Sequence, residues 1–332
     1  YENFNNDAQE TDHFHEYAME MQTDSAGNVY YAKAARHALP ALVPQHGTLM
    51  MVDRDGRHSR VLARGFRAPN GLLVNDDGSF ILSDQEGHWT PMNRINWVTP
   101  GKYYGNMMAF NPEELEPDET EPPVVWIHRE IDRSPAAQVW VPKESWGSLG
   151  GGLLNLSYGT GKVYQILYQQ TSNKLQGGIF ELPIPDFPTG IQRGRFQDEW
   201  LYVCGLFGWS SDKTKPGGFY RVRATGKPID LPQQLALTRD GLFLEFPEPL
   251  DTKQATDPRN YVVSRWNYRR TANYGSDDYR VSVGRPGRDV VSVSSVSVSS
   301  DGRNVFLHIP EMQLCDQMRL RFRIPSARDS MV

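Results

Sequence analysis

Cysteine is scarce in this sequence, since only Cys204 and Cys315 occur among its 332 residues. Two distant cysteines make neither a disulfide framework nor a C-x-x-C metal motif, and we expect both to be buried thiols. The chain has no C-x-x-C-H motif, so we expect that no haem is attached to it. It also has no run of roughly 18 apolar residues, which predicts no membrane span.

The chain also lacks an excess of charge of either sign. It contains 35 Lys and Arg residues and 40 Asp and Glu residues, giving a formal net charge of -5, and the two signs are mixed along the sequence. A surface that binds nucleic acid or an anionic membrane needs concentrated positive charge. We therefore predict no nucleic-acid partner.

Long runs of Ala, Leu, Glu and Lys, which build surface helices, are missing as well. The 29 Gly, 23 Pro and 11% aromatic residues are typical of a turn-rich β protein packed on aromatic side chains. Four segments combine a polar turn with short aromatic or β-branched runs, and each predicts two strands around a tight turn. They are residues 23–34, 70–84, 153–169 and 197–209. Asp77 and Gly78 supply residue types that tolerate positive φ in such a turn.

Repeated hairpins without helices between them predict an all-β chain that contains a β-propeller, in which antiparallel sheets stand radially around an axis. A β-sandwich is the alternative for any single hairpin. Long irregular stretches at residues 34–47 and 85–108 favour the propeller, because propellers carry their chemistry on loops over one face. The acidic, Pro-rich residues 111–126 predict a solvated surface loop.

The pattern changes near residue 230, where we place a domain boundary. Residues 290–300 largely alternate Val with Ser, and residues 318–324 alternate apolar residues with Arg, which is the period of a strand with one buried face. The predicted domains are a β-propeller over residues 1–230, an immunoglobulin-like β-sandwich over 231–326 and a tail over 327–332.

Two stretches carry a family resemblance, "GFRAPNGLLV" at residues 65–74 and "SDQEGHWTPMNRINWVTPGKYYG" at residues 83–105. They resemble the soluble quinoprotein sugar dehydrogenases, whose propeller has a G-x-R-N-P-x-G turn, an acidic calcium loop ending in I-N, and a G-x-x-Y-G turn. The chain is also similar to the propeller of large extracytoplasmic bacterial proteins that carry a c-type cytochrome domain. In those relatives an immunoglobulin-like module follows, beginning with a D-G-x-x-x-x-F-x-x-P-L-D pattern, here Asp240 to Asp251.

The resemblance implies an oxidoreductase that acts on a sugar or alcohol, uses pyrroloquinoline quinone (PQQ) with calcium, and passes electrons to a cytochrome. It implies that His15 removes the proton of the substrate hydroxyl and that Arg67 holds the quinone beside the reacting groups. Further cofactor contacts are expected from Asn70, Trp89, Tyr104 and Arg133, and the rings of Trp89 and Tyr104 suit stacking on a sugar. The same relatives imply a periplasmic or extracellular location.

These residue types also suit the chemistry on their own terms. An imidazole with a pKa near 6.5 is a base for a hydroxyl, and Arg is a planar donor for carboxylates or a quinone. The structural alternatives are a packed, hydrogen-bonded His15 and a salt-bridged Arg67. His13 and His15, on one face of an expected strand, are a further candidate metal pair.

Asp84, Gln85 and Glu86 are the candidate metal ligands, because calcium prefers side-chain oxygen atoms. Calcium needs six to eight such atoms, however, and this loop supplies few charges. The chain departs from the pattern of the sugar dehydrogenases at four nearby positions, which are Ala68, Met92, Asn93 and Arg94.

Three functions follow as alternatives. The first is a quinoprotein-like oxidoreductase with a c-type cytochrome domain or subunit as partner. The second is a non-catalytic propeller that binds carbohydrate or a protein in a larger extracytoplasmic assembly. The third is a carbohydrate lyase or hydrolase that uses His15 with Tyr and Arg residues on the same face. Propellers host all three, so the fold alone does not choose.

The length of the propeller region leads to one more expectation. About 225 residues at about 40 to 50 per blade make four or five blades, whereas the sugar dehydrogenases close their ring with six. We therefore expect a partial propeller whose N-terminal blades are missing from this chain, having been removed or being supplied by another polypeptide.

Overall fold

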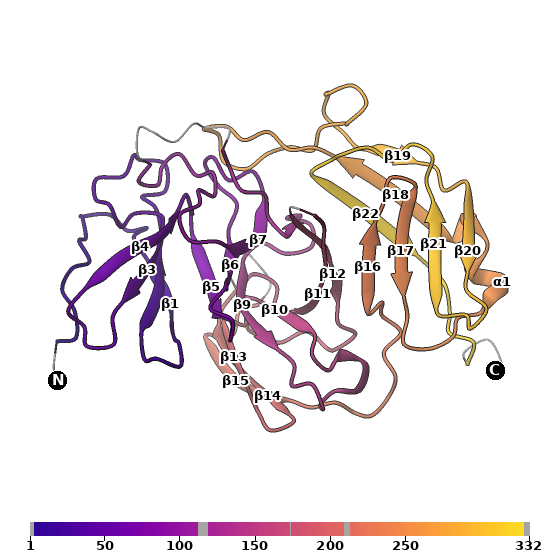
Figure 1. Ribbon diagram of the computed structural model, residues 1–332, viewed down its shortest axis with the longest axis horizontal. Coiled ribbons are helices and arrows are strands. Elements are labelled where there is room, and N and C mark those ends of the chain that lie inside the picture. Colours follow the sequence, from indigo (N-terminus) through magenta and orange to yellow (C-terminus); the bar gives the residue numbers. More distant parts are fainter. Residues whose placement is uncertain (1–2, 112–118, 173, 209–212, 329–332) are drawn as a thin grey trace.

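The computed structural model describes residues 3–111, 119–172, 174–208 and 213–328, and nearly all of their regular structure is β (Figure 1). An arc of sheets occupies the indigo to salmon part of the chain, and a separate pair of sheets forms the orange to yellow part. None of the helices in these ranges has the length and hydropathy needed to cross a bilayer.

Four antiparallel sheets follow one another along the first two thirds of the chain, and three of them have four strands in chain order. The first contains β1 (Ala18–Thr23), β2 (Val29–Lys33), β3 (Thr48–Val52) and β4 (Ser59–Arg64). The second contains β5 (Pro69–Val74), β6 (Phe80–Asp84), β7 (Asn93–Val98) and β8 (Val125–Ile127). The third contains β9 (Pro135–Trp140), β10 (Leu153–Ser157), β11 (Val163–Gln170) and β12 (Leu175–Glu181), and the 3-10 helix η1 (Gly147–Leu149) lies between its first two strands. The fourth contains β13 (Arg193–Gln197), β14 (Trp200–Leu206) and β15 (Gly217–Val222).

The first strand of each sheet lies on the inside of the arc. Strand β5 packs against β1 and β9, and β13 packs against β9. Radial sheets with their first strands around a common axis are the blades of a β-propeller. The described residues therefore form a propeller of three four-stranded blades and one three-stranded blade.

Apolar side chains fill the space between neighbouring blades. Strand β6 shows how, because Phe80 and Leu82 pack toward the first blade while Ile81 packs toward the third. Successive side chains of a strand point to opposite faces, so a blade buried on both faces has a continuous apolar run rather than an alternating one. This is why residues 80–82 are all apolar.

The C-terminal part is a β-sandwich whose two antiparallel sheets share one core. One sheet has the order β16-β17-β21-β20, formed by Gln234–Leu237, Gly241–Glu245, Asn304–His308 and Ser295–Val298. The other has the order β19-β18-β22, formed by Asp289–Val291, Tyr261–Trp266 and Gln317–Phe322. Two short helical turns, α1 (Thr252–Ala255) and η2 (Pro258–Asn260), precede β18. The last blade strand ends at Val222 and the first sandwich strand begins at Gln234, so the connection contains residue 230.

Several details differ from the sequence-based expectations. Residues 85–108 are not one loop, because β7 runs through them from Asn93 to Val98. The Val and Ser run at 290–300 is divided between β19 and β20, which belong to different sheets. Part of the expected surface loop at 111–126 lies outside the described residues.

The cysteines are less buried than expected. Both are free thiols, but Cys204 is exposed and Cys315 is half-buried. Cys204 lies opposite Phe219 in the β14-β15 pair, on the face that points away from the third blade. Its position in the strand, rather than the apolar character of cysteine, sets its exposure.

Gly71 of the inner strand β5 offers a test of the propeller packing. A Cβ at this position would lie 1.9 Å from the carbonyl oxygen of Ala136 in β9, which is far inside contact distance. We expect Gly71→Ala to lower the free energy of unfolding by about 3 kcal/mol, because the inner strands must move apart. Gly217→Ala is the control, since the nearest atom there is 3.7 Å away, and it should stay within about 1 kcal/mol of wild type. Urea unfolding followed by tryptophan fluorescence measures both, and equal losses would contradict the packing.

Candidate functional site

The candidate site lies at one end of the propeller axis. Antiparallel strands alternate in direction, so the segment before each inner strand and the loop between the second and third strands of each blade come to the same end. In the first two blades these are the residues before β1, the β2-β3 loop, the β4-β5 turn and the β6-β7 loop. This end is therefore built from segments far apart in sequence.

Five aromatic rings form a row across this end of the propeller, which we call the aromatic row. The centroids of Tyr17 and His15 are 5.5 Å apart, those of His15 and His37 are 5.1 Å apart, and those of His37 and His88 are 4.8 Å apart. Tyr274 of the sandwich ends the row, at 5.6 Å from His88. Both domains therefore contribute to it.

Arg67 lies against the aromatic row and is only 3% exposed. Its Nη2 donates to Nδ1 of His37 at 2.9 Å, and its Nη1 donates to Oε1 of Gln85 at 3.3 Å. The guanidinium carbon also lies 5.2 Å from the ring centroid of Tyr274, within the range of a cation–π contact. Residue 87 is a glycine because a Cβ there would lie 2.2 Å from Nε of Arg67.

A buried carboxylate aims Arg67. Asp84 ends β6, and its Oδ2 and Oδ1 accept the backbone N–H groups of Arg67 and Ala68 at 2.9 Å and 2.7 Å. These two hydrogen bonds fix the backbone of the β4-β5 turn, from which the Arg67 side chain extends to His37. Two loop residues of the site, His37 with φ 57° and Trp89 with φ 62°, adopt the left-handed conformation that is costly for residues other than glycine.

Hydrogen bonds assign different protonated nitrogens to two of the histidines. Nδ1 of His15 lies 2.7 Å from the carbonyl oxygen of Ala35, which can only accept, so Nδ1 carries the proton and Nε2 has a free lone pair. Nδ1 of His37 accepts from Arg67, so neutral His37 carries its proton on Nε2. His15 can therefore accept a proton at Nε2, whereas His37 can donate a hydrogen bond from Nε2.

Burial and the guanidinium keep the histidines neutral. Burial, and then the charge of Arg67, lower the pKa of His15 to about 4. The same two causes lower the pKa of His37 and of His88 below their ordinary value. At neutral pH the site therefore holds neutral imidazoles beside the positive charge of Arg67.

The structure brings several of the predicted site residues together. His15 and Arg67 are joined through His37, and Gln85 contacts both Arg67 and, through its Nε2, the carbonyl oxygen of Arg133 at 3.2 Å. Arg133 itself is exposed beside this contact. The predicted catalytic pair is thus close in space.

Other predicted residues lie elsewhere. Tyr104 is 2% exposed and stacks on Phe66 at 4.9 Å within the core between the first two blades, so its ring faces no open site. Asn70 points toward the inside of the arc, where its Oδ1 accepts from Nη1 of Arg193 at 3.2 Å. The backbone N–H of Trp89 donates to the carbonyl oxygen of Thr271 at 2.8 Å, so this residue helps to join the two domains.

The candidate calcium ligands do not fit a calcium site. Both oxygens of Asp84 accept backbone N–H groups, and Oε1 of Gln85 accepts from Arg67. The Glu86 carboxylate lies 3.4 Å from the Arg129 guanidinium. Within the described ranges there is no group of three or more His, Cys, Asp or Glu side chains that could hold a metal ion. Each candidate ligand is therefore occupied by the protein itself.

His13 and His15 do not form the expected pair on a strand. They lie in a turn before β1, and the backbone N–H of His15 donates to Nδ1 of His13 at 3.2 Å. This hydrogen bond occupies Nδ1 of His13 and leaves only its Nε2 as a possible metal ligand. The interpretation of these two residues as a metal pair is not supported by the turn.

Sequence reasoning assigned no individual site role to His37, His88 or Tyr274. His37 and His88 each lie in a loop between the second and third strands of a blade, and this shared position is the signal that could have found them. Tyr274 lies in a loop of the other domain, so no local pattern could have linked it to Arg67.

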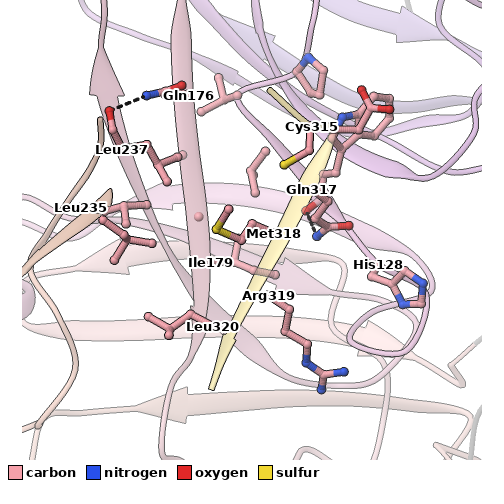
Figure 2. Close-up of a pocket in the computed structure, with 18 of the residues that line it drawn as sticks. His128, Gln176, Ile179, Leu235, Leu237, Cys315, Gln317, Met318, Arg319 and Leu320 are labelled. Atoms are coloured by element: carbon pink, nitrogen blue, oxygen red, sulfur yellow. Dashed lines mark hydrogen bonds between the residues drawn. The ribbon is translucent and has the colours of Figure 1, made fainter. Parts of the chain in front are cut away.

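A cleft of about 1130 Å³ lies between the propeller and the sandwich (Figure 2). Its lining includes the apolar side chains of Ile179, Leu235, Met318 and Leu320. Burial raises the pKa of the Cys315 thiol to about 11, so this thiol is not a nucleophile at neutral pH. Glu130 at the edge is paired with Arg288 and Arg319 at 3.2 Å and 3.1 Å. His128 also lines the cleft, but its Nε2 is paired with Asp278 at 3.2 Å. Glu130 and His128 are thus paired, and we take the aromatic row as the candidate site.

Comparison with known proteins gives no matching family model and no matching curated protein. Among solved structures, the chain is similar to a putative oxidoreductase (glucose dehydrogenase) from Thermus thermophilus, with 14% identity, a TM-score of 0.44, and coverage of 61% of this chain and 63% of that one. It is also similar to the apo-form of the soluble aldose sugar dehydrogenase from Escherichia coli, with 17% identity, a TM-score of 0.42, and coverage of 57% and 60%. The PQQ-bound aldose sugar dehydrogenase from Streptomyces coelicolor gives 12% identity, a TM-score of 0.44, and coverage of 60% of each chain.

These neighbours are titled glucose or aldose sugar dehydrogenases, the class of protein that the motifs at residues 65–74 and 83–105 resemble. The chain spans about three fifths of their length. At such identities and TM-scores the likeness carries no argument about activity. The functional conclusion therefore rests on the residues of the aromatic row and Arg67.

The charge of Arg67 makes a prediction for its neighbours. Arg67→Gln removes a cation that lowers the pKa of both His15 and His37, so both pKa values should rise toward their ordinary value. Titration of the imidazole proton resonances by NMR measures this, and the His15 midpoint should move upward from about 4. Arg303→Gln, an exposed position on the sandwich, should leave both midpoints unchanged. An unmoved His15 midpoint in Arg67→Gln would contradict the site geometry.

The low pKa of His15 also predicts how stability depends on pH. In the unfolded chain the pKa of His15 is about 6.5, whereas in the fold it is about 4. The unfolded state thus binds more protons between these values, so the contribution of neutral His15 is present above pH 6.5 and is lost as the pH falls toward 4. Against His15→Gln, wild type should lose about 2 kcal/mol more unfolding free energy over this range, measured by urea unfolding at each pH. A constant difference between the two proteins would show that His15 titrates normally.

Proposed function

We propose that this chain is an oxidoreductase propeller that acts on a hydroxyl group of a sugar or alcohol, with the aromatic row as its active centre. The observation that carries the proposal is the joining of His15 and Arg67 through His37 at one end of the propeller axis. A base with a free lone pair thus lies beside a donor and a fixed cation. Removing a hydroxyl proton while stabilising negative charge requires these three groups.

His15 is the base in this proposal. Its Nδ1–H is held by the Ala35 carbonyl, so its Nε2 is the nitrogen that accepts the proton of the substrate hydroxyl. Arg67 weakens this base while the site is empty, because a nearby positive charge disfavours the imidazolium. An anion bound next to Arg67 offsets that charge and so raises the proton affinity of His15. His15 is therefore a stronger base once an anionic group is bound next to Arg67.

PQQ is the cofactor that we propose for this position. The residues present suit a planar anion, since the Arg67 guanidinium and the Nε2–H of His37 are donors. When bound, PQQ supplies a two-electron acceptor. Calcium is not part of the proposal, because its candidate ligands are already hydrogen-bonded or ion-paired.

The partners follow from the chemistry. Electrons taken from a sugar must leave to an acceptor, for which we propose a c-type cytochrome domain or subunit in a periplasmic or extracellular assembly. We also propose that further blades continue the ring, and the outer face of the fourth blade supports this because Phe219 is 71% exposed there. The strand orders β16-β17-β21-β20 and β19-β18-β22 support an immunoglobulin-like sandwich.

Non-catalytic carbohydrate binding is the second candidate. It is favoured by the exposed residues at the two ends of the aromatic row, since Tyr17 is 46% exposed and Tyr274 is 47% exposed, and by Phe14, which contacts His37 and is 71% exposed. Exposed aromatic faces next to polar groups are typical of sugar-binding surfaces.

Reconstitution separates the two candidates. We expect the purified chain to bind added PQQ, seen as a shifted quinone absorbance and quenched tryptophan fluorescence, and then to reduce an artificial dye acceptor with glucose or another aldose. Arg67→Met should lose PQQ binding at least tenfold, because it loses a charged donor, while Arg303→Gln should bind as wild type does. Absence of both PQQ uptake and dye reduction would exclude the oxidoreductase, and sugar binding without turnover would establish the second candidate.

A further inference from the structure

A loop of the sandwich reaches across to the propeller. Residues 267–288 connect β18 to β19, and we call them the crossing loop. In Figure 1 this orange segment extends from the sandwich along the upper edge toward the indigo blades. It brings a tyrosine of the C-terminal domain to the aromatic row of the N-terminal one.

Backbone hydrogen bonds hold the tip of the crossing loop on the propeller. The N–H of Trp89 donates to the carbonyl oxygen of Thr271 at 2.8 Å, and the N–H of Gly275 donates to the carbonyl oxygen of Gly87 at 3.0 Å. Between these contacts, His88 and Tyr274 form an antiparallel bridge. The tip thus pairs with the β6-β7 loop in the manner of a short strand.

Side chains fix the flanks of the crossing loop. Arg270 donates from Nη1 to the carbonyl oxygen of Gly105 at 3.0 Å, and the Asp278 carboxylate lies 3.2 Å from Nε2 of His128. Arg269 lies over the ring of Tyr279, 3.8 Å from its centroid, at the base of the loop. The position of the tip therefore does not depend on the side chain of Tyr274.

The ring of Tyr274 keeps open surface in spite of its contacts. Its centroid lies 5.2 Å from the guanidinium carbon of Arg67 and 5.6 Å from the ring centroid of His88, yet 47% of the residue remains exposed. Tyr274 therefore presents open surface beside the imidazoles.

We infer that Tyr274 is a stacking platform for a sugar unit of the substrate, so that the active site is shared by both domains and takes an oligosaccharide in preference to a monosaccharide. The inference rests on the proposed function for the carbohydrate nature of the substrate. His37 separates Tyr274 from His15, with its ring centroid 6.2 Å from the first and 5.1 Å from the second. A sugar unit stacked on Tyr274 is thus separated from His15, the base, by the width of the His37 ring. The reacting sugar unit lies next to the stacked unit, beside His15.

The other end of the aromatic row supports the same assignment. Phe14 contacts His37 at 5.9 Å and Tyr17 contacts His15 at 5.5 Å, and both are exposed. Exposed aromatic residues other than Tyr274 thus also contact the imidazoles. A ligand with two sugar rings can place one ring on Tyr274 and the next beside His15, on the other side of His37.

The test measures how affinity depends on the number of sugar units, without any cofactor. Glucose, maltose, maltotriose, cellobiose and cellotriose are titrated into the full chain by calorimetry and by NMR. For wild type we expect the di- and trisaccharides of at least one series to bind about three- to tenfold more tightly than glucose, the range for one aromatic stacking contact. Tyr274→Leu should remove this length dependence, while Tyr274→Phe should retain it. Val283→Ala, at a 59% exposed position of the same loop, is the matched control and should behave as wild type.

The outcomes also separate this inference from the proposed function. Equal length dependence in wild type and Tyr274→Leu, no length dependence in wild type, or no binding of any of the five sugars would each overturn the role of Tyr274. Length dependence that requires Tyr274 supports the inference even if PQQ is not taken up, in which case only the oxidoreductase falls. PQQ uptake with dye reduction but without any effect of Tyr274→Leu removes the inference alone.

Discussion

The site depends on one buried carboxylate, that of Asp84. It accepts the backbone N–H groups of Arg67 and Ala68 and lies opposite Arg94 in the β6-β7 pair. Burial raises its pKa, while these hydrogen bonds and the nearby guanidinium groups act in the opposite direction. The carboxylate that resembled a calcium ligand thus acts as the support of a turn, and this turn directs Arg67 into the aromatic row.

The sequence allowed the architecture to be predicted better than the site. Hairpins were recognisable because turn residues such as Asp77 and Gly78 must supply special backbone conformations between apolar runs. His15 and Arg67 came from a family resemblance and lie close together. By contrast, the motif around Tyr104 resembles an exposed aromatic turn, and only the packing of the blade reveals that its ring is buried on Phe66.

Residues that meet only through tertiary structure were beyond sequence reasoning. Tyr274 reaches Arg67 from a different domain, and the contact depends on backbone pairing of the crossing loop with residues 87–89. Burial of individual strand residues was equally hard to predict, as exposed Cys204 shows. Its face of β14 has no neighbouring blade among the described residues, so its surroundings follow from the arrangement of the blades and not from its apolar character.

The cleft between the domains affects how their orientation responds to temperature. Polar contacts join its edges, such as the hydrogen bond from Nε2 of Gln317 to the carbonyl oxygen of Trp126 at 2.8 Å, whereas apolar side chains in its middle face open space. Phe180 of the third blade packs against the sandwich core, so turning the domains apart exposes this apolar side chain and carries a positive heat-capacity change. Since Glu130 pairs with Arg288 and Arg319 at the edge of the cleft, salt should also alter the angle between propeller and sandwich.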